Sequence, residues 1–397
     1  MRILIIGQLP KEAGGNYTTG AAKVVHEISK QHIVNVELSV YATNTPEATA
    51  RKNSVYPNQY IGYKKDAWGV LKDVLFHPIR TLREWRHYRR IDHENPLRYA
   101  FYKTNIRRAI KLVNPDLIHV NSIGNVSASR FALEGKYTPI LLTCHGIFYR
   151  GDANDVKGHD IYQGNLPLCD YYTGLTEESR HEFTDILGVS PEQYTIIPNG
   201  VDSSKFFFSE KWRIQIRQQM AVSEDTKVFI TVASLQERKG QLAFIKILEQ
   251  LGIDYQYWLV GLGPDKERIE AFVNNNHLES KVKLLGYRNS DELFKYYSAS
   301  DIYAHPSWKE GQALSEIEAY STGLRTMVNT AIQGTLIDNP KSEHYCLVNF
   351  ESPDIVYINN WINQGKVIER TSKQKYDWAN IARRYAVIYE VIINKKR

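Results

Sequence analysis

The chain has few cysteines: three among 397 residues, at Cys144, Cys169 and Cys346. That number is too small for a disulfide framework, and the wide spacing matches no cysteine-based metal motif. We therefore expect buried free thiols in a reducing compartment. An apolar run of membrane-spanning length is also lacking, and residues 1–7 are too short and too abruptly interrupted for a signal peptide. These absences predict a cytoplasmic protein.

Two motifs that point to particular enzyme chemistries are missing as well. The loop at residues 8–20 holds paired glycines, but not in the pattern G-x-G-x-x-G, which removes the main support for a dinucleotide-dependent dehydrogenase. The loop suits either close approach of the backbone to a ligand, at Gly15, or a flexible surface position. No Asp-x-Asp triplet occurs, and no carboxylate pair stands out as a clamp for a divalent metal. We expect no metal and no cofactor.

Positive charge is concentrated in one segment. The formal net charge is +6, but residues 80–111 hold ten Lys or Arg against three acidic residues, a net charge of +7 that leaves −1 for all other residues. Apolar residues recur at helical spacing near the start of this segment, with arginines among them. They are Val70, Leu71, Val74, Leu75, Leu82 and Trp85. The pattern predicts an amphipathic pair of basic helices.

Three interpretations of this basic region stay open. It could contact anionic lipid headgroups, or a phosphate-bearing lipid acceptor, in a protein held peripherally at the inner face of a membrane. It could equally be an ordinary helix pair whose apolar stripe packs on its own sheet while its arginines face solvent. Nucleic acid is the weakest candidate, because nothing in the sequence resembles a module that reads DNA or RNA. We expect no nucleic-acid partner.

Strand-like apolar runs alternate with helical segments in two successive sets. A chain of this length, with 43% hydrophobic residues, can bury two cores. We predict an α/β protein with two doubly wound, Rossmann-like domains that face each other across a cleft, at residues 1–204 and 205–375. A terminal amphipathic helix at 376–397 crosses back to the first domain. The predicted strands are residues 2–6, 34–41, 116–120, 140–144, 171–176 and 194–197, then 228–233, 257–261, 282–285, 302–304 and 326–329.

The segment 299–323 carries the clearest functional pattern. It is typical of a buried strand, a turn that contains Pro306, a loop and a helix. Such a turn directs free backbone N–H groups to the place above the strand end, and the helix dipole favours an anion there. Glu310 and Glu318 could then accept hydrogen bonds from ligand hydroxyls on either side of bound phosphates, as in a sugar nucleotide. Alternatively, Ser315 and Glu318 form a capping box and Glu310 is a plain surface residue.

This segment resembles the Glu-x7-Glu signature of retaining, family 4-type glycosyltransferases (glycosyl transferases group 1), which have the GT-B fold. Residues 198–202 also match the Pro-Asn-Gly-Val-Asp that the family has at its domain junction, and Lys239-Gly240 matches the end of its diphosphate-binding loop. The resemblance is loose over residues 1–190 and firmer over 194–323. The matching signature residues are Pro306, Ser307, Glu310, Gly311, Leu314, Glu318 and Ala319.

The chain departs from the family pattern at two places. Gln312-Ala313 replaces an aromatic residue followed by glycine, and Ser234 replaces the arginine of the diphosphate-binding loop. Either Arg238 supplies the missing charge, or one cation and the helix-terminal N–H groups hold the diphosphate. A metal-independent reaction agrees with the GT-B class.

The resemblance implies roles for four side chains. Lys239 would bind the leaving diphosphate, Glu310 would hold hydroxyls of the donor sugar, and Glu318 would hold the ribose. His145, at the end of a predicted strand, would face the other side of the sugar, unless it is a structural histidine bonded in its turn. Catalysis is therefore assigned to Glu310, His145 and Lys239. The other implied donor-binding positions are Gly15, Ser234, Arg238, Gly286, Tyr287, Arg288, Gly311, Gln312, Ala313, Leu314 and Ser315.

The implied reaction is transfer of a hexose or N-acetylhexosamine from a nucleoside-diphosphate sugar, with UDP favoured, to a hydroxyl acceptor with retention at the anomeric carbon. The acceptor would be a glycan, a lipid-linked molecule or a protein, in bacterial surface polysaccharide or glycoconjugate assembly. One alternative is a catalytically silent GT-B subunit that binds a sugar nucleotide or glycan beside an active partner. A second is a sugar-nucleotide epimerase. Hydrolysis by paired carboxylates is disfavoured, because an activated donor needs no general acid.

Overall fold

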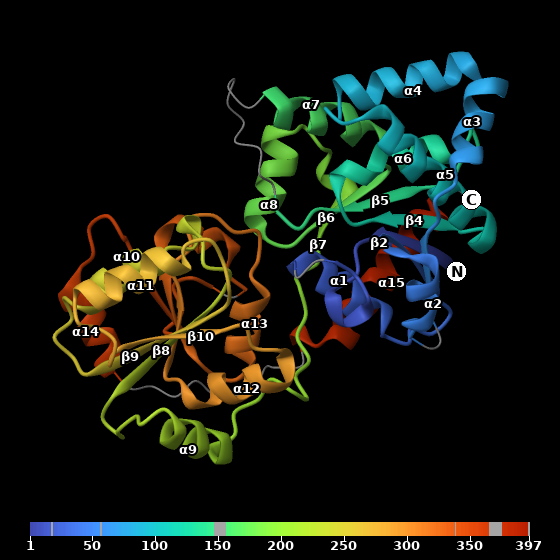
Figure 1. The fold of residues 1–397 in the computed structure, drawn as a ribbon. Helices are drawn as coiled ribbons and strands as arrows, with labels where there is room; N and C mark the ends of the chain where they lie inside the picture. The colour runs from blue at the N-terminus through green and yellow to red at the C-terminus, as the bar shows by residue number, and fades with distance from the viewer. Residues whose placement is uncertain (17–18, 56–57, 147–155, 338, 365–374, 396–397) are drawn as a thin grey trace. The chain divides into compact units, whose positions relative to one another are not determined.

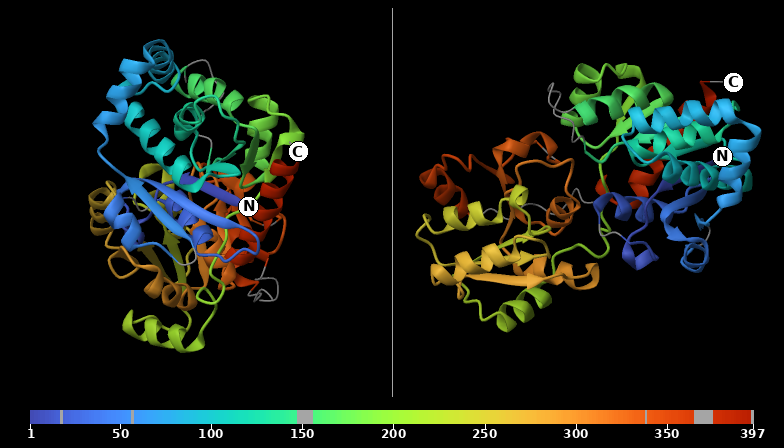
Figure 2. Two further views of the ribbon diagram at one scale, coloured as in Figure 1. Left: turned by 90° about the vertical axis from the view of Figure 1, so that its right-hand side faces the viewer. Right: turned by 45° about the horizontal axis from the view of Figure 1, so that its top comes forward.

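The structure is a computed structural model that describes residues 1–16, 19–55, 58–146, 156–337, 339–364 and 375–395. The chain forms two compact units, Met1–Pro198 with Trp378–Arg397, and Asn199–Asp377. Each unit contains one parallel sheet with helices on both faces (Figures 1 and 2). The predicted α/β class with two Rossmann-like domains is confirmed.

The division falls six residues before the predicted boundary at 204. Val201 pairs with Asp377 through an isolated bridge, and Phe206 packs in the core of the second unit. Residues 199–204 therefore belong to the second unit, because their contacts lie there. The last helix, α15 (Trp378–Asn394), groups with the first unit.

The first unit has a seven-stranded sheet in the order β3-β2-β1-β4-β5-β6-β7. All neighbouring strands are parallel, and β1, β4, β5 and β6 are almost wholly buried, which explains their continuous apolar runs. The predicted strands each begin within three residues of the observed start, but β3 was not predicted. The strands are β1 (Arg2–Gly7), β2 (Glu37–Pro46), β3 (Gln59–Tyr63), β4 (Leu117–Val120), β5 (Ile140–Thr143), β6 (Tyr171–Gly174) and β7 (Tyr194–Ile196).

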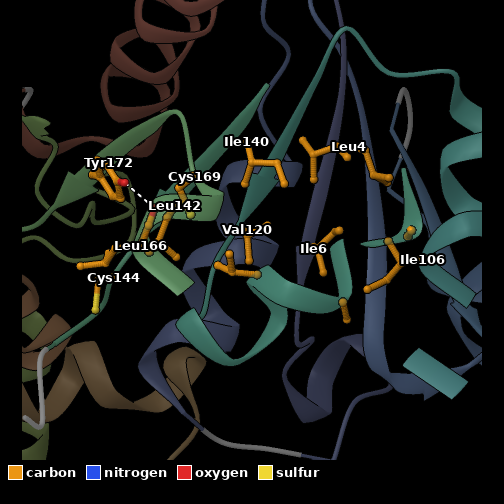
Figure 3. Close-up of a cluster of buried hydrophobic side chains, with 14 of the residues drawn as sticks. Leu4, Ile6, Ile106, Val120, Ile140, Leu142, Cys144, Leu166, Cys169 and Tyr172 are labelled. Carbon is orange, nitrogen blue, oxygen red and sulfur yellow. Dashed lines mark hydrogen bonds between the residues drawn. The ribbon is translucent and has the colours of Figure 1, made fainter. Parts of the chain in front are cut away.

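Helices cover both faces of this sheet and close its core. Figure 3 shows strand residues such as Leu4 and Val120 packed with Ile106. Tyr172 donates a hydrogen bond from its hydroxyl to the carbonyl of Leu166 at 2.6 Å. All three cysteines are buried free thiols, as predicted. The helices are α1 (Gly20–Ser29), α2 (Glu47–Lys52), α3 (Ala67–Phe76), α4 (Pro78–Arg90), α5 (Pro96–Val113), α6 (Val126–Ala132), α7 (Val156–Asn165) and α8 (Glu177–His181).

Helix α15 is attached to this sheet through a buried polar group. His119 on β4 contacts the Tyr389 hydroxyl at 2.8 Å through Nδ1 and the Thr143 hydroxyl at 2.7 Å through Nε2. Burial, with a smaller effect of His145, lowers the pKa of His119 to about 3. The imidazole is therefore neutral at neutral pH, and one of its nitrogens accepts a hydrogen bond.

The predicted amphipathic pair of helices is present as α3 and α4, but most leucines of its apolar stripe do not pack against the sheet. Leu71, Leu75 and Leu82 are exposed, although Val70 is buried. Tyr88 and Trp85 of α4 pack on the core of the unit, and the buried acidic residues Asp73 and Glu84 share this inner side. In the part of the chain that the structure describes, no helix is both long enough and apolar enough to cross a bilayer.

The second unit has a six-stranded parallel sheet in the order β10-β9-β8-β11-β12-β13. The predicted strands of this half begin within two residues of their observed starts, whereas β13 was not predicted. The strands are β8 (Lys227–Val232), β9 (Tyr255–Val260), β10 (Val282–Gly286), β11 (Ile302–His305), β12 (Arg325–Asn329) and β13 (Tyr345–Val348). The helices are α9 (Glu210–Gln219), α10 (Gln241–Leu248), α11 (Lys266–Asn275), α12 (Ser290–Ala299), α13 (Leu314–Ser321) and α14 (Ile355–Asn363).

Candidate active site

Two loops of the second unit lie against each other at the carboxyl ends of the central strands β8 and β11. Gly240 has a φ of 69°, and a Cβ atom at this position would lie 2.2 Å from the carbonyl oxygen of Pro306. Only glycine fits such a close approach with this backbone conformation. The Trp308 N–H also donates to the Arg238 carbonyl at 2.8 Å. The β8–α10 loop and the β11–α13 loop are thus joined.

This junction brings the predicted cations beside the first predicted glutamate. Lys239 forms an ion pair with Glu310, and both side chains are largely buried. The Arg238 Nη1 atom lies 4.0 Å from Glu310 Oε1 and donates to the Lys309 carbonyl at 3.2 Å. Arg238 therefore approaches the same carboxylate from the exposed side.

A third neighbour, His305, was not predicted as a site residue. It is the last residue of β11, it is buried, and its Nε2 atom lies 3.9 Å from Glu310 Oε1. Its Nδ1 atom is buried and has no hydrogen-bond partner among the described residues. The sequence signal was present, because a histidine at the end of a central parallel strand faces the region where such folds bind ligands.

The charges of this cluster depend on each other. Burial alone would raise the pKa of Glu310, but His305 and the charge of Lys239 hold it far below its usual range. Burial lowers the pKa of Lys239, and the charge of Glu310 opposes that change. Glu310 is therefore a carboxylate that already has a cationic partner, and Lys239 is a cation available to another anion only if it leaves Glu310 or bridges both.

The helix after the second loop has no side-chain cap. Its N-cap is Ala313, and the Ser315 hydroxyl bonds to the Tyr303 hydroxyl at 2.8 Å instead of to the helix backbone. Glu318 accepts from the Tyr297 hydroxyl at 3.3 Å. The alternative in which Ser315 and Glu318 form a capping box is therefore wrong. In the first turn of α13 the Glu316 N–H donates to the Ala313 carbonyl at 3.2 Å, while the Leu314 and Ser315 N–H groups donate to no group among the described residues. These two N–H groups are the ones that an anion site can use.

Gln312 makes hydrogen bonds within the second unit. Its side-chain Oε1 accepts from the Asn199 backbone N–H at 2.7 Å, and the Asn199 side chain donates to the Gln312 carbonyl at 3.1 Å. The side chain thus connects the signature loop to the Pro-Asn-Gly-Val-Asp segment. Its side-chain oxygen is engaged within the protein.

Glu316 lies between the two predicted glutamates but is turned inward and fully buried. Its Oε1 atom accepts from the Tyr345 hydroxyl at 2.9 Å and from the Ile337 N–H at 3.3 Å. Burial is the main cause that raises its pKa to about 8. Glu316 is therefore mainly protonated at neutral pH and adds little negative charge beside Glu310. No sequence pattern distinguishes it from its two neighbours.

The loops after β9 and β10 continue this edge. The Gly261 N–H donates to the Gly286 carbonyl at 2.9 Å, and a Cβ atom on Gly263 would lie 2.1 Å from the Leu235 carbonyl. These contacts link the position predicted for the base to the loop predicted to bind the diphosphate. Tyr287 is exposed there.

Two more of the predicted positions, Arg288 and Ser234, make contacts near them in the sequence. Arg288 donates to the Tyr296 hydroxyl at 3.2 Å, and the Ser234 carbonyl accepts from the Gln241 side chain at 3.0 Å. The predicted positions of the second unit thus follow the carboxyl ends of strands of the same sheet.

His145 and Gly15 belong to the first unit. The His145 Nε2–H donates to Asn121 Oδ1 at 3.0 Å, while burial lowers the pKa of His145 to about 4. A Cβ atom on Gly15 would lie 1.7 Å from the Leu9 carbonyl, which itself accepts from Asn44 at 2.9 Å. The described part of this loop is therefore packed closely, which argues against a merely flexible segment.

Metal-binding groups of three or more His, Cys, Asp or Glu are absent from the described ranges of the chain. The positive groups at the candidate site are instead the side chains of Lys239 and Arg238 and the first turn of α13.

Known families match most of the chain. Residues 213–337 match the family described as Glycosyl transferases group 1, and residues 18–205 match Glycosyltransferase Family 4. The two matches together cover more than half of the sequence. The first includes Lys239, Glu310 and Glu318, and the second includes His145.

Individual relatives are more distant. The chain is 24% identical over 262 residues to an uncharacterized glycosyltransferase of Methanocaldococcus jannaschii, across 62% of this chain and 66% of the relative. It is 30% identical over 240 residues to UDP-Gal:alpha-D-GlcNAc-diphosphoundecaprenol alpha-1,3-galactosyltransferase of Escherichia coli, across 57% and 60%. The chain spans less than two thirds of the length of either relative.

The fold also has solved counterparts. Sucrose-phosphate synthase from Thermosynechococcus elongatus superposes with a TM-score of 0.74 over 99% of both chains, at 16% sequence identity. At this identity the likeness shows the fold alone.

Proposed function

The chain belongs to the glycosyl transferases group 1, of the family 4 type with the GT-B fold, and from this membership we propose that it is a retaining glycosyltransferase. It moves a hexose or N-acetylhexosamine from a nucleoside-diphosphate sugar to a hydroxyl acceptor. The name of the Escherichia coli relative contains a UDP-sugar and a diphosphoundecaprenol acceptor, which favours a UDP donor and a lipid-linked acceptor. Assembly of bacterial surface polysaccharide or another glycoconjugate is the corresponding setting.

The observation that carries this proposal is the cluster of Lys239, Arg238 and Glu310 beside the uncapped start of α13. When the bond from sugar C1 to the diphosphate breaks, negative charge grows on the diphosphate oxygens. Cations and helix N–H groups fixed at that place stabilise the transition state more than the ground state. Lys239 and Arg238 supply the cations, so Arg238 compensates for Ser234.

Glu310 then changes partner during the reaction cycle. In the free protein it pairs with Lys239, and when a donor binds, the diphosphate competes for that cation. The carboxylate, still ionised because its pKa is far below neutral, can accept hydrogen bonds from donor-sugar hydroxyls. The acceptor oxygen forms its bond to C1 on the face that the diphosphate leaves, and the acceptor proton passes to the leaving group.

Two further residues have roles in the proposal, one in each unit. Glu318 is held by Tyr297 and is placed to bind ribose hydroxyls from the first turns of α13. His145, in the first unit, is neutral at physiological pH because its pKa lies near 4, so any hydrogen bond that it makes to a ligand is that of a neutral imidazole. No step in this scheme calls for a metal, and turnover is expected to survive a chelator.

The rival function is a silent subunit that binds a sugar nucleotide without turning it over. Ser234 and the inward-tied Gln312 favour it, because each replaces a residue that the family pattern has at the site. An epimerase would also need a sugar nucleotide, but no acceptor.

The test is incubation of the purified protein with UDP-, GDP- and ADP-sugars, with and without lipid-linked, glycan or protein acceptors and with EDTA. We expect slow release of one nucleotide, stimulation by one acceptor class, and loss of both in Lys239→Ala. Lys281→Ala, which breaks the exposed ion pair of Lys281 with Glu249 in the same unit, is the matched control. Binding without release would support the silent subunit, and a sugar isomer formed without acceptor would support the epimerase.

A further inference from the structure

Helices α3 and α4 expose an unusual number of large apolar side chains. Ile79, Phe76, Trp68 and Leu75 have exposed fractions of 85%, 72%, 67% and 62%, and their neighbours Leu71 and Leu82 are exposed too. The set surrounds the short turn between the helices, which holds only His77. Single exposed apolar residues are ordinary, but a cluster of this kind on one helix pair marks an interaction site. We call it the α3–α4 surface, and its members are Trp68, Leu71, Leu75, Phe76, Ile79 and Leu82.

The orientation of this surface follows from charges on the opposite side of each helix. Asp73 is two residues from Leu71 and from Leu75, which places it about 200° around the helix from both. Glu84 has the same relation to Leu82. Both acidic residues are buried. The apolar residues therefore face away from the body of the unit because the acidic residues face toward it.

The acidic side is held by α5. Lys103 is almost fully buried and lies 2.7 Å from Asp73 and 2.5 Å from Glu84. Arg107 donates to Asp73 at 2.9 Å, and the Thr81 hydroxyl donates to the Asp73 carbonyl at 2.9 Å. A buried charge cluster of this kind is strongly disfavoured if a partner is withdrawn, so the helix pair is fixed with its apolar side outward.

The free charge around the α3–α4 surface has one sign. Asp73 and Glu84 are the only acidic residues on α3 and α4, and both are neutralised by α5. The exposed cations of the two helices are Lys72, Arg83, Arg86, Arg89 and Arg90. None of these five forms an ion pair within the described residues. The unpaired cations thus cover a smaller part of the chain than the basic region predicted at 80–111. Lys103, Arg107 and Arg108 on α5 belong to that region but already have acidic partners.

We propose that the α3–α4 surface binds an anionic lipid bilayer, with Phe76 and Ile79 at the turn entering the acyl boundary and Lys72, Arg83 and Arg86 at the headgroups. Large aliphatic and aromatic side chains next to cations alone are what a helix in the plane of an anionic interface requires. Figure 1 shows α3 and α4 along the outside of the first unit, with α5 between them and the sheet. The proposal does not depend on the transferase activity, since it involves no residue of the candidate active site.

The test is flotation of the full chain with vesicles of phosphatidylcholine alone or of phosphatidylcholine with phosphatidylglycerol. We expect binding to the anionic vesicles only, and weaker binding at high salt. Phe76→Ser with Ile79→Ser should weaken the binding at least about tenfold, because most of the inserted apolar area is lost. Arg83→Gln with Arg86→Gln should weaken it by about fivefold for each arginine. Thermal melting checks that each variant is folded.

The matched control is Val356→Ser with Val387→Ser, which removes two exposed valines from α14 and α15. This pair should bind vesicles as the wild type does. The proposal is overturned if the wild type does not float with anionic vesicles, or if the control pair and the Phe76/Ile79 pair lose binding equally. It is also overturned if the wild type is a dimer that Phe76→Ser with Ile79→Ser converts to a monomer while vesicle binding is unaffected, since the surface then contacts a second copy.

Discussion

Lys239 and Glu310 form a buried ion pair between two loops that lie 71 residues apart in the sequence. The contact depends on Gly240, which lets the β8–α10 loop touch Pro306. It comes just before the first turn of α13, whose Leu314 and Ser315 N–H groups donate to no group among the described residues. In the proposed mechanism, this pair is the resting state of the site. A donor diphosphate takes Lys239 as its counter-ion, and Glu310 then binds the sugar.

Glu310→Gln separates binding from turnover. Removing the carboxylate frees Lys239 from its competitor, so the nucleotide should bind as well as to the wild type or more tightly. Turnover of the donor should fall by roughly 100-fold or more, the usual effect of removing one group that stabilises a transition state. Titration calorimetry and nucleotide release measure the two quantities. Glu249→Gln, at an exposed ion pair in the same unit, is the control. Parallel loss of binding and turnover would contradict the exchange of partners.

Gly240→Ala should disrupt the junction of the loops. The alanine must adopt a φ of 69° and also displace the Pro306 carbonyl from 2.2 Å. Gly252→Ala is a matched control, because Gly252 has a φ of 65° but a Cβ atom added there would meet no atom within 4 Å. The control should cost about 1–2 kcal/mol of unfolding free energy, from the left-handed conformation alone. Gly240→Ala should cost more and also weaken nucleotide binding. Equal effects on binding would show that the loop contact is unimportant to the site.

Glu316→Gln should change how stability depends on pH. The folded-state pKa of Glu316 is about 8 and the unfolded value about 4.5, so the folded state binds the extra proton between those values. The stabilisation of the folded state by this proton is complete below pH 4.5. It is lost as pH rises through 8, by up to about 1.4 kcal/mol of unfolding free energy per pH unit. The amide resembles the protonated acid and does not titrate. Chemical unfolding should show that the unfolding free energy of the variant, relative to that of the wild type, is higher at pH 9 than at pH 5. A constant difference would contradict a buried, protonated Glu316.

His119→Gln tests the attachment of α15. Here the stability of the wild type falls as pH decreases, whereas for Glu316 it falls as pH increases. The folded-state pKa of His119 is about 3 and the unfolded value 6.5, so the unfolded state binds more protons between them. The wild type should therefore lose stability as pH falls below 6.5, by up to about 1.4 kcal/mol per unit, and the variant should lack this part of the loss. The difference in unfolding free energy between the two should narrow from pH 7 to pH 5.

Much of the fold was predictable because buried parallel strands leave apolar runs that little else in a sequence resembles. The strands at 2–6 and 228–233 are clear for this reason. β3 and β13 were not predicted; each is an edge strand of its sheet, and β3 also lies within a segment of weak pattern. The exposure of Leu71 and Leu75 could not be predicted, because the apolar stripe that carries them has the same sequence pattern whether it faces the core or the solvent. Only the partners of Asp73 decide between them.

The site was predictable as far as local motifs reach. Lys239, Glu310 and Glu318 stand in recognisable patterns, and the structure places all three at the edge of one sheet. The ion pair between Lys239 and Glu310 joins loops from different strands and leaves no local signal. The burial of Glu316 and the hydrogen bond between Gln312 and Asn199 also depend on tertiary structure, so no local sequence pattern predicts them.

The most direct test compares the binding of UDP and of uridine to the wild type, Lys239→Ala and Lys281→Ala by titration calorimetry. If Lys239 holds the diphosphate, the wild type and Lys281→Ala should bind UDP at least about tenfold more tightly than uridine, since a charge-assisted hydrogen bond contributes about 1.5–3 kcal/mol. Lys239→Ala should lose most of that advantage while its affinity for uridine stays the same. An unchanged ratio in Lys239→Ala would contradict the diphosphate site.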